Sequence, residues 1–97
     1  MAFVVTATWK AKPGEEARIL EVIKLMTPLS RREPGNLAYQ AQVSHQDPGT
    51  FLIYEQYISA AAFEDHKASA YFQEHVLGYA IHRLASRELA TWETIDF

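Results

Sequence analysis

Four segments of the chain are predicted to be β-strands, and the first two of them alternate between apolar and polar residues with the two-residue period of a strand. They cover residues 3–11, 37–45, 50–58 and 88–95. The first is the clearest, because one side carries Phe3, Val5, Ala7, Trp9 and Ala11 and the other Val4, Thr6, Thr8 and Lys10. The β-branched and aromatic content of these segments also favours strands.

A helical repeat follows the first strand. Lys12-Pro13-Gly14 ends that strand, and the acidic residues 15 and 16 suit the first turn of a helix. Residues then recur at helical spacing, namely Ala17, Leu20, Ile23, Lys24 and Thr27, with Ile19, Val22 and Met26 beside them. The repeat predicts a helix over residues 15–32, which Pro28 is expected to bend or shorten.

Shorter helices are expected between the third and fourth strands. Ser59 has the properties of an N-cap for a helix over residues 60–67. A second helix is predicted over residues 70–77, with a break at Gly78 and a helical stretch over residues 79–84.

The element order is β-α-β-β-α-β, which predicts an α+β fold of the ferredoxin-like type, an antiparallel four-stranded sheet with helices on one face. The turn at residues 46–49 joins two of the strands as a hairpin. The third strand is apolar on both faces, with Phe51, Ile53 and Tyr57 on one side and Leu52, Tyr54 and Ile58 on the other. We therefore expect the uncovered face to pack against a second copy, which gives a homodimer in the form of a dimeric α/β barrel.

Composition narrows the class of protein. The 97 residues suffice for one domain over residues 1–97, and a 48% hydrophobic content is that of a globular chain. Scattered basic residues and a net charge of -3 argue against nucleic-acid binding. We expect no membrane segment and no signal peptide, and hence a cytoplasmic protein. The absence of Cys excludes thiolate catalysis, and the His spacing predicts no metal site.

A series of short motifs resembles the antibiotic biosynthesis monooxygenase family, including its quinol-monooxygenase-like members, over almost the whole chain. In chain order they are Lys12-Pro13-Gly14, Ser30-Arg31-Arg32-Glu33-Pro34-Gly35 with Leu37 and Tyr39, Asp47-Pro48 before Phe51, Glu55 before the aromatic Tyr57, and His66 followed by Ser69 and Tyr71-Phe72. The resemblance implies the same dimeric fold and an enzyme that oxidises a small hydroxylated aromatic, a quinol or a polyketide-type phenol, with O2 and no cofactor.

The chain departs from the family pattern at several positions. Asn36 stands where the family usually has Cys, and Tyr57 where it often has Trp. The heme-degrading members use an Asn on the first strand, a Trp near the end of the third and a His on the next helix. Of these three, only the His has a counterpart here, His66.

The resemblance implies that His66 is the catalytic general base. Removal of a phenolic or enolic proton gives an anion that can pass an electron to O2, so the substrate supplies the reducing power. The candidate substrate-binding residues are Tyr39, Tyr54, Glu55, Tyr57, Tyr71 and Phe72. Glu55 is surrounded by apolar residues and is expected to pair with an Arg or to orient a His. Trp9 and Trp92 are interpreted as packing residues of outer strands.

Three other functions remain open from the sequence. A heme-binding or heme-degrading protein would use His66 as an iron ligand. An isomerase-like enzyme would use the same base without O2. A non-catalytic module would only hold a small ligand in the cavity.

Overall fold

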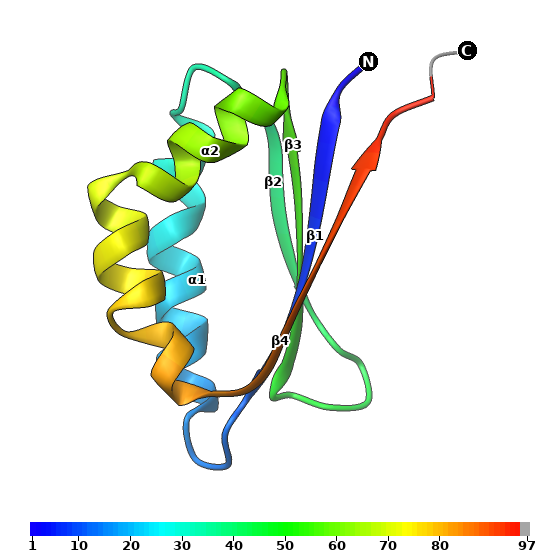
Figure 1. The fold of residues 1–97 in the computed structure, drawn as a ribbon. Coiled ribbons are helices and arrows are strands. Elements are labelled where there is room, and N and C mark those ends of the chain that lie inside the picture. The colour runs from blue at the N-terminus through cyan, green and yellow to red at the C-terminus, as the bar shows by residue number, and fades with distance from the viewer. Residues whose placement is uncertain (96–97) are drawn as a thin grey trace.

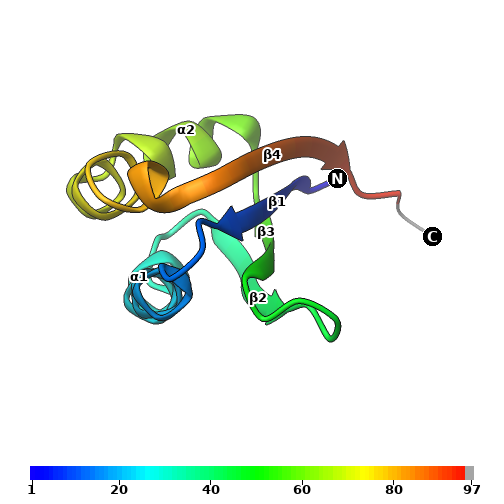
Figure 2. The same ribbon diagram turned by 90° about the horizontal axis from the view of Figure 1, so that it is seen from below.

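The computed structural model describes residues 1–95 and confirms the α+β architecture (Figure 1). The elements are β1 (Phe3–Ala11), α1 (Glu16–Arg31), β2 (Asn36–Val43), β3 (Thr50–Tyr57), α2 (Ala60–Ala68), the π-helical turn η1 (Phe72–Leu77), the 3-10 turn η2 (Ala80–Arg83) and β4 (Leu84–Glu93). The antiparallel strands are ordered β2-β3-β1-β4. Both helices lie on one side of the sheet, as the view from below also shows (Figure 2).

Local signals determine where the elements begin and end. Gly14, in the turn between β1 and α1, has a φ of 86°, which residues other than glycine rarely adopt. Ser59 caps α2, since its hydroxyl accepts a hydrogen bond from the backbone N–H of Ala62. The expected helix over residues 70–77 contains a π-helical turn, in which Gly78 N–H donates to the carbonyl of Gln73.

The buried face of helix α1 differs from the series of helically spaced residues that stood first in the sequence-based prediction. Its buried residues are Ile19, Val22, Ile23, Met26 and Ser30. Leu20 is partly exposed, and Ala17 and Lys24 face solvent. The helix continues through Pro28 to Arg31, so this proline does not shorten it.

The sheet has two different faces. The face toward the helices carries most of the core, in a cluster that includes Trp9, Ile53 and Phe72. On the other face Thr8 pairs with Leu52 and Thr6 with Tyr54, and the exposed Trp92 donates from its indole to the Thr6 hydroxyl. No helix of the described chain has the length and apolar character needed to cross a membrane.

Two sequence-based expectations about the outer strands were wrong. Trp9 lies on β1, which is an interior strand of the sheet; only Trp92, on β4, belongs to an edge strand. Strand β4 also begins at Leu84 rather than at residue 88, because Leu84 already pairs with Ala11 beyond a register shift. The earlier start places Arg87 within the strand.

Candidate active site

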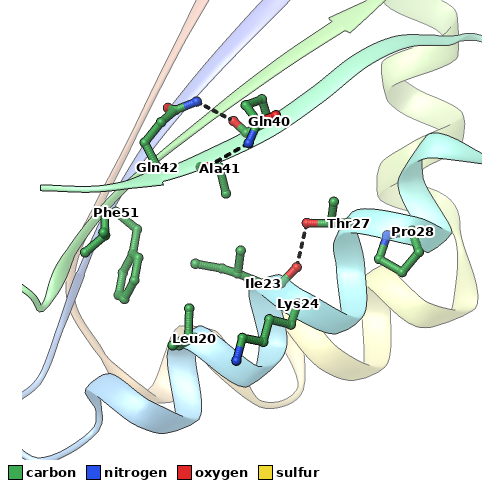
Figure 3. A pocket seen from close by; sticks show the side chains of 10 residues that line it. Leu20, Ile23, Lys24, Thr27, Pro28, Gln40, Ala41, Gln42 and Phe51 are labelled. Atoms are coloured by element: carbon green, nitrogen blue, oxygen red, sulfur yellow. Dashed lines mark hydrogen bonds between the residues drawn. The ribbon is translucent and has the colours of Figure 1, made fainter.

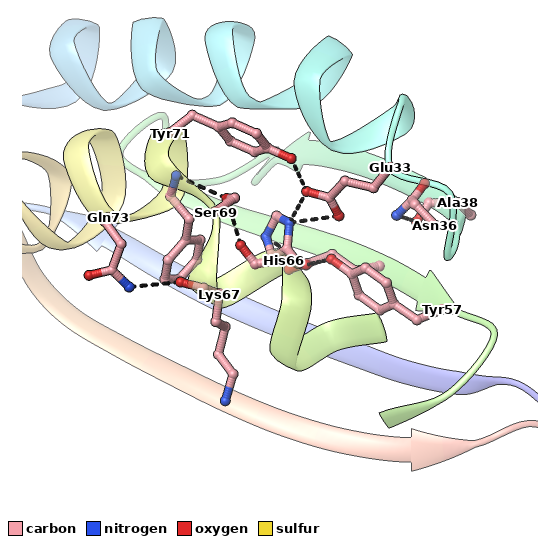
Figure 4. A network of polar contacts seen from close by, with 11 residues as sticks. Glu33, Asn36, Ala38, Tyr57, His66, Lys67, Ser69, Tyr71 and Gln73 are labelled. Atoms are coloured by element: carbon pink, nitrogen blue, oxygen red, sulfur yellow. Dashed lines mark hydrogen bonds and ion pairs between the residues drawn. The ribbon is translucent and has the colours of Figure 1, made fainter. Parts of the chain in front are cut away.

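A buried histidine lies between two carboxylates where α2 packs on the sheet. The His66 side chain is 2% exposed, and its Nδ1 lies 2.8 Å from Oε2 and 3.1 Å from Oε1 of Glu33 (Figure 4). Its other nitrogen, Nε2, lies 3.6 Å from Oε1 of Glu55 on β3. Glu33 comes from the loop that follows α1, so three segments of the chain meet at this imidazole.

Tyrosine hydroxyls hold both carboxylates in place. Tyr57 donates to Oε1 of Glu55 at 2.6 Å, and Tyr71 donates to Oε2 of Glu33. Because an ionised carboxylate only accepts hydrogen bonds, the contact with Glu33 places a hydrogen on Nδ1 of His66. Nε2 of a neutral imidazole is then free to accept a proton. Its 3.6 Å separation from Glu55 is too long for a direct hydrogen bond.

The electrostatics of the site favour proton uptake by Glu55. Burial raises the pKa of Glu55, and the hydrogen bond from Tyr57, a proton on His66 and the charge of Arg87 oppose the rise only in part. Burial also raises the pKa values of Tyr39 and Tyr57, and it raises the pKa of Tyr71, together with the bond to Glu33, to about 12. These hydroxyls therefore stay protonated at neutral pH, and the proton acceptors are the imidazole and the carboxylate.

Backbone packing at Gly35 sets the position of α2 relative to Glu33. A Cβ at Gly35 would lie 2.5 Å from the Cβ of Ala62, so the loop and the helix approach too closely for any side chain there. The helix ends just beyond His66, where the Ser69 hydroxyl donates to the His66 carbonyl at 2.7 Å. The Glu-Pro-Gly segment thus brings its carboxylate to the imidazole through a close contact of backbones.

His66 and Glu55 line a cavity of about 220 Å³ between the sheet and the helical layer. The lining residues are Ala7, Trp9, Tyr39, Ile53, Glu55, Phe63, His66, Lys67, Phe72, Val76, Arg87, Leu89 and Thr91. An apolar cavity of roughly 150 Å³ accommodates benzene, so this one has room for a single substituted ring. Apolar walls with a few converging polar groups are typical of small-molecule sites.

A larger hollow lies between α1 and the edge strand β2, but it lacks this chemistry. It encloses about 400 Å³, and its lining includes Lys24, Thr27 and Phe51 but no carboxylate or histidine (Figure 3). Thr27 uses its hydroxyl within the helix, donating to the Ile23 carbonyl at 2.7 Å. We therefore assign the candidate active site to the smaller cavity.

The structure brings together only some of the residues expected at the pocket. His66, Glu55, Tyr39 and Phe72 line the cavity. Three tyrosines expected to contact a ligand do not line it: Tyr57 and Tyr71 bond to the carboxylates behind it, and Tyr54 bonds to Gln56 on the opposite face of the sheet. Tyr54 alternates with Ile53 and Glu55 along β3, which explains its orientation.

Sequence reasoning missed several residues of the site, among them three charged ones and one tryptophan. Glu33 belongs to the Glu-Pro-Gly motif, but a lone carboxylate in a loop gave no sign of its partner. Arg87 was missed because the last strand was expected to begin after it. Lys67 lies one residue beyond His66, and Trp9, interpreted as a packing residue, belongs to the buried core cluster and also lines the cavity.

The residues of the site do not suit heme. The cavity volume corresponds to about one ring rather than to a macrocycle, and Nε2 of His66 is turned toward Glu55. Within residues 1–95, no group of three His, Cys, Asp or Glu side chains is placed to hold a metal ion.

Residues 2–77 match the sequence profile of the antibiotic biosynthesis monooxygenase family, so the chain belongs to that family. A curated relative, the uncharacterized protein sll1783 of Synechocystis, is 29% identical over 73 residues. That match covers 75% of this chain and 50% of the relative, so the chain spans about half the length of the curated relative it matches.

Several solved structures share the fold. Rv0793 of Mycobacterium tuberculosis superimposes with a TM-score of 0.91 at 18% identity, covering 100% of this chain and 98% of its own. PA3566 of Pseudomonas aeruginosa gives a TM-score of 0.90 at 22% identity, covering 98% and 95%. A structure described as an antibiotic biosynthesis monooxygenase gives 0.89 at 24% identity, covering 97% and 99%.

Proposed function

We propose that this protein is a cofactor-independent monooxygenase that oxidises a small hydroxylated aromatic, a quinol or a polyketide-type phenol, with O2. The observation that carries the proposal is the buried His66 between Glu33 and Glu55, at the wall of an apolar cavity of single-ring size. Membership of the antibiotic biosynthesis monooxygenase family supports the reaction class.

In this reaction the pair formed by His66 and Glu55 takes the proton of the substrate hydroxyl. The hydrogen bond from Nδ1 to Glu33 fixes the tautomer that leaves Nε2 free to accept it. Burial raises the pKa of Glu55, which makes this carboxylate a stronger base than an exposed one. The apolar walls keep water away from the resulting anion.

The substrate anion then supplies the electrons. It transfers one electron to O2, and the radical pair combines to form a carbon–peroxide bond. Loss of water from the peroxide leaves a carbonyl, so that a substrate RH2 and O2 give RO and H2O. Every electron comes from the substrate, and the protein only moves protons and positions the ring.

We also propose that the active form is a homodimer built on the uncovered face of the sheet. On that face Leu52 and Trp92 are large, apolar and exposed. Sheets of this kind bury such surfaces by packing face to face. The helical layer, and with it the cavity, stays on the outside of the dimer.

The test is oxygen uptake by the purified protein, without added cofactor, against quinols and anthrone-like phenols. The proposal predicts uptake above autoxidation, with one O2 consumed per product and one atom of 18O2 in the product. Conversion of substrate without O2 consumption would instead indicate an isomerase-like enzyme that uses the same base. Saturable binding with no conversion of any compound in the panel would indicate a binding protein and contradict the proposal.

A further inference from the structure

Arg87 brings an unpaired positive charge to the wall of the cavity. It lies on β4, is half-buried, and lines the cavity together with Leu89 and Thr91. Its Nε is buried without a hydrogen-bond partner, and no carboxylate within residues 1–95 lies close enough, at 4.0 Å or less, to form an ion pair with it. A half-buried guanidinium without an ion pair, on which only the charge of Glu55 acts favourably, is not fully compensated in the folded chain, which calls for an explanation in terms of function.

Lys67, the other cationic residue that lines the cavity, already has interaction partners. Nζ of Lys67 lies 2.9 Å from Oε1 of Glu64 and 4.7 Å from the centre of the Phe63 ring. The ammonium thus already has an ion-pair partner and an aromatic face beside it. Arg87 is therefore the cation available to a ligand inside the cavity.

Arg87 and Glu55 lie at opposite corners of the cavity floor. Val5 of β1 pairs with Glu55 on one side, and Trp9 of β1 pairs with Arg87 on the other. The backbone positions of the two residues are therefore offset by four residues along the sheet, roughly 13 Å, and by two strand spacings, roughly 10 Å, while their side-chain charges still act on each other. Both project from the helix-covered face, so a ligand in the cavity lies between them.

We propose that Arg87 binds a negatively charged oxygen of the substrate, which is a single-ring compound with an ionisable hydroxyl at the Glu55 end and an acceptor oxygen at the opposite end of the ring. This assignment rests on the proposed function for the role of the base. The family match ends at residue 77 and does not include β4, so it says nothing of Arg87.

Charge balance supports this orientation. When the hydroxyl proton passes to the pair of His66 and Glu55, conjugation through the ring moves negative charge to the far oxygen where this belongs to a carbonyl or nitro group, next to the guanidinium. The net charge of the cavity stays the same, because the carboxylate is neutralised as the ligand becomes an anion. A ring with a hydroxyl but no oxygen at the far end would gain nothing from Arg87.

The test uses 4-nitrophenol, which has this arrangement of oxygens and whose anion is visible by absorption without any turnover. The wild-type protein is expected to bind it and to increase the bound anion fraction at a fixed pH. Arg87→Met is expected to weaken binding of 4-nitrophenol by roughly tenfold to a hundredfold, as loss of a charged hydrogen bond predicts. Arg87→Lys should retain part of the effect, and binding of phenol should be the same in all three proteins.

Arg18→Met is the matched control, since Arg18, on α1, pairs with Glu15 and does not line the cavity, so its loss should leave the affinity for 4-nitrophenol unchanged. Thermal unfolding distinguishes this role from a structural one, because loss of an arginine that stabilised the fold would lower the melting temperature. Arg87→Met should be as stable as the wild type or more stable, because it removes an unpaired charge. Equal weakening for phenol and 4-nitrophenol, or unchanged binding of 4-nitrophenol to Arg87→Met, would overturn the assignment.

The two proposals fail separately. Selective binding of 4-nitrophenol that depends on Arg87, without oxygen uptake on any substrate, would contradict the monooxygenase but leave the anion site in place. Oxygen uptake that is unaffected by Arg87→Met would contradict the anion site alone.

Discussion

His66 and Glu33, 33 residues apart in the chain, meet with Nδ1 2.8 Å from Oε2, and this contact determines which ring nitrogen faces the cavity. Tyr71 donates to the same carboxylate oxygen, so Glu33 is itself held in place. Glu33 lines a separate surface hollow with Pro34 and Asp65 and does not line the cavity. Glu33 therefore acts as a positioning residue, whereas His66 and Glu55 face the ligand.

Glu33→Gln is predicted to impair the base while leaving the fold intact. The amide can either accept from Nδ1 or donate to it, so the tautomer of His66 is no longer fixed. We expect a mixture of tautomers by 15N NMR of the imidazole and a fall in kcat of at least about tenfold, with little change in KM. A single unchanged tautomer together with full activity would show that Glu33 does not position His66.

Glu55→Gln is predicted to remove a pH dependence of stability. Because burial raises the folded-state pKa of Glu55 above its ordinary value of 4.5, folding favours the protonated carboxyl. The contribution of the protonated Glu55 carboxyl to the stability of the folded protein is fully present at pH values below the ordinary pKa. It is lost as pH rises through the raised pKa. Urea unfolding at a series of pH values should thus show that the free energy of unfolding of the variant rises relative to that of the wild type as pH increases.

The neutral amide should also lower activity, because it cannot take a proton. A Glu55→Gln variant whose stability follows that of the wild type in parallel from acid to alkaline pH would show that the carboxyl does not titrate as a buried group.

Gly35→Ala is predicted to damage both stability and the site. The new methyl group would overlap Ala62 and push α2, with His66, away from Glu33. Overpacking of this kind costs about 1–3 kcal/mol of unfolding free energy, measurable by urea titration. Gly14→Ala is the comparison, because its strain comes from a φ of 86° with nothing within 4 Å. It should lower stability without changing the kcat of the folded protein, and equal kinetic effects of the two substitutions would contradict this account.

Leu52→Asp is predicted to dissociate the proposed homodimer. The side chain lies on the uncovered face of the sheet, 42% exposed in the single chain, so a carboxylate there is harmless to the monomer but unfavourable in an apolar interface. Sedimentation equilibrium should give a dimer for the wild type and a monomer for the variant. A wild-type protein that remains monomeric at high concentration would exclude the face-to-face dimer.

The strand pattern and the capping signals made the architecture predictable from sequence. Alternation identified β1 as a strand, and Ser59 marked the start of α2 to the residue. The buried face and the ends of an element were harder to predict where tertiary packing determines them. The buried stripe of α1 depends on which side meets the sheet, and the start of β4 depends on its pairing with β1.

The candidate site was predictable only in part, for a physical reason. Glu55 appeared as an isolated carboxylate among apolar residues, and His66 as part of a motif, so both could be singled out. Their partnership with Glu33 arises from the close approach of Gly35 to Ala62, which no local pattern encodes. Sequence could not separate Phe72, at the cavity, from Tyr57 and Tyr71, behind it.

The most direct test of the central claim compares oxygen uptake by His66→Gln and His75→Gln on the same quinol. His75 lies on η1, partly exposed and beside Glu74, and does not line the cavity, so it is a matched histidine outside the site. We predict that uptake falls to the autoxidation level in His66→Gln and is unchanged in His75→Gln, with both proteins folded. Full uptake by His66→Gln would contradict the assignment of His66 as the base.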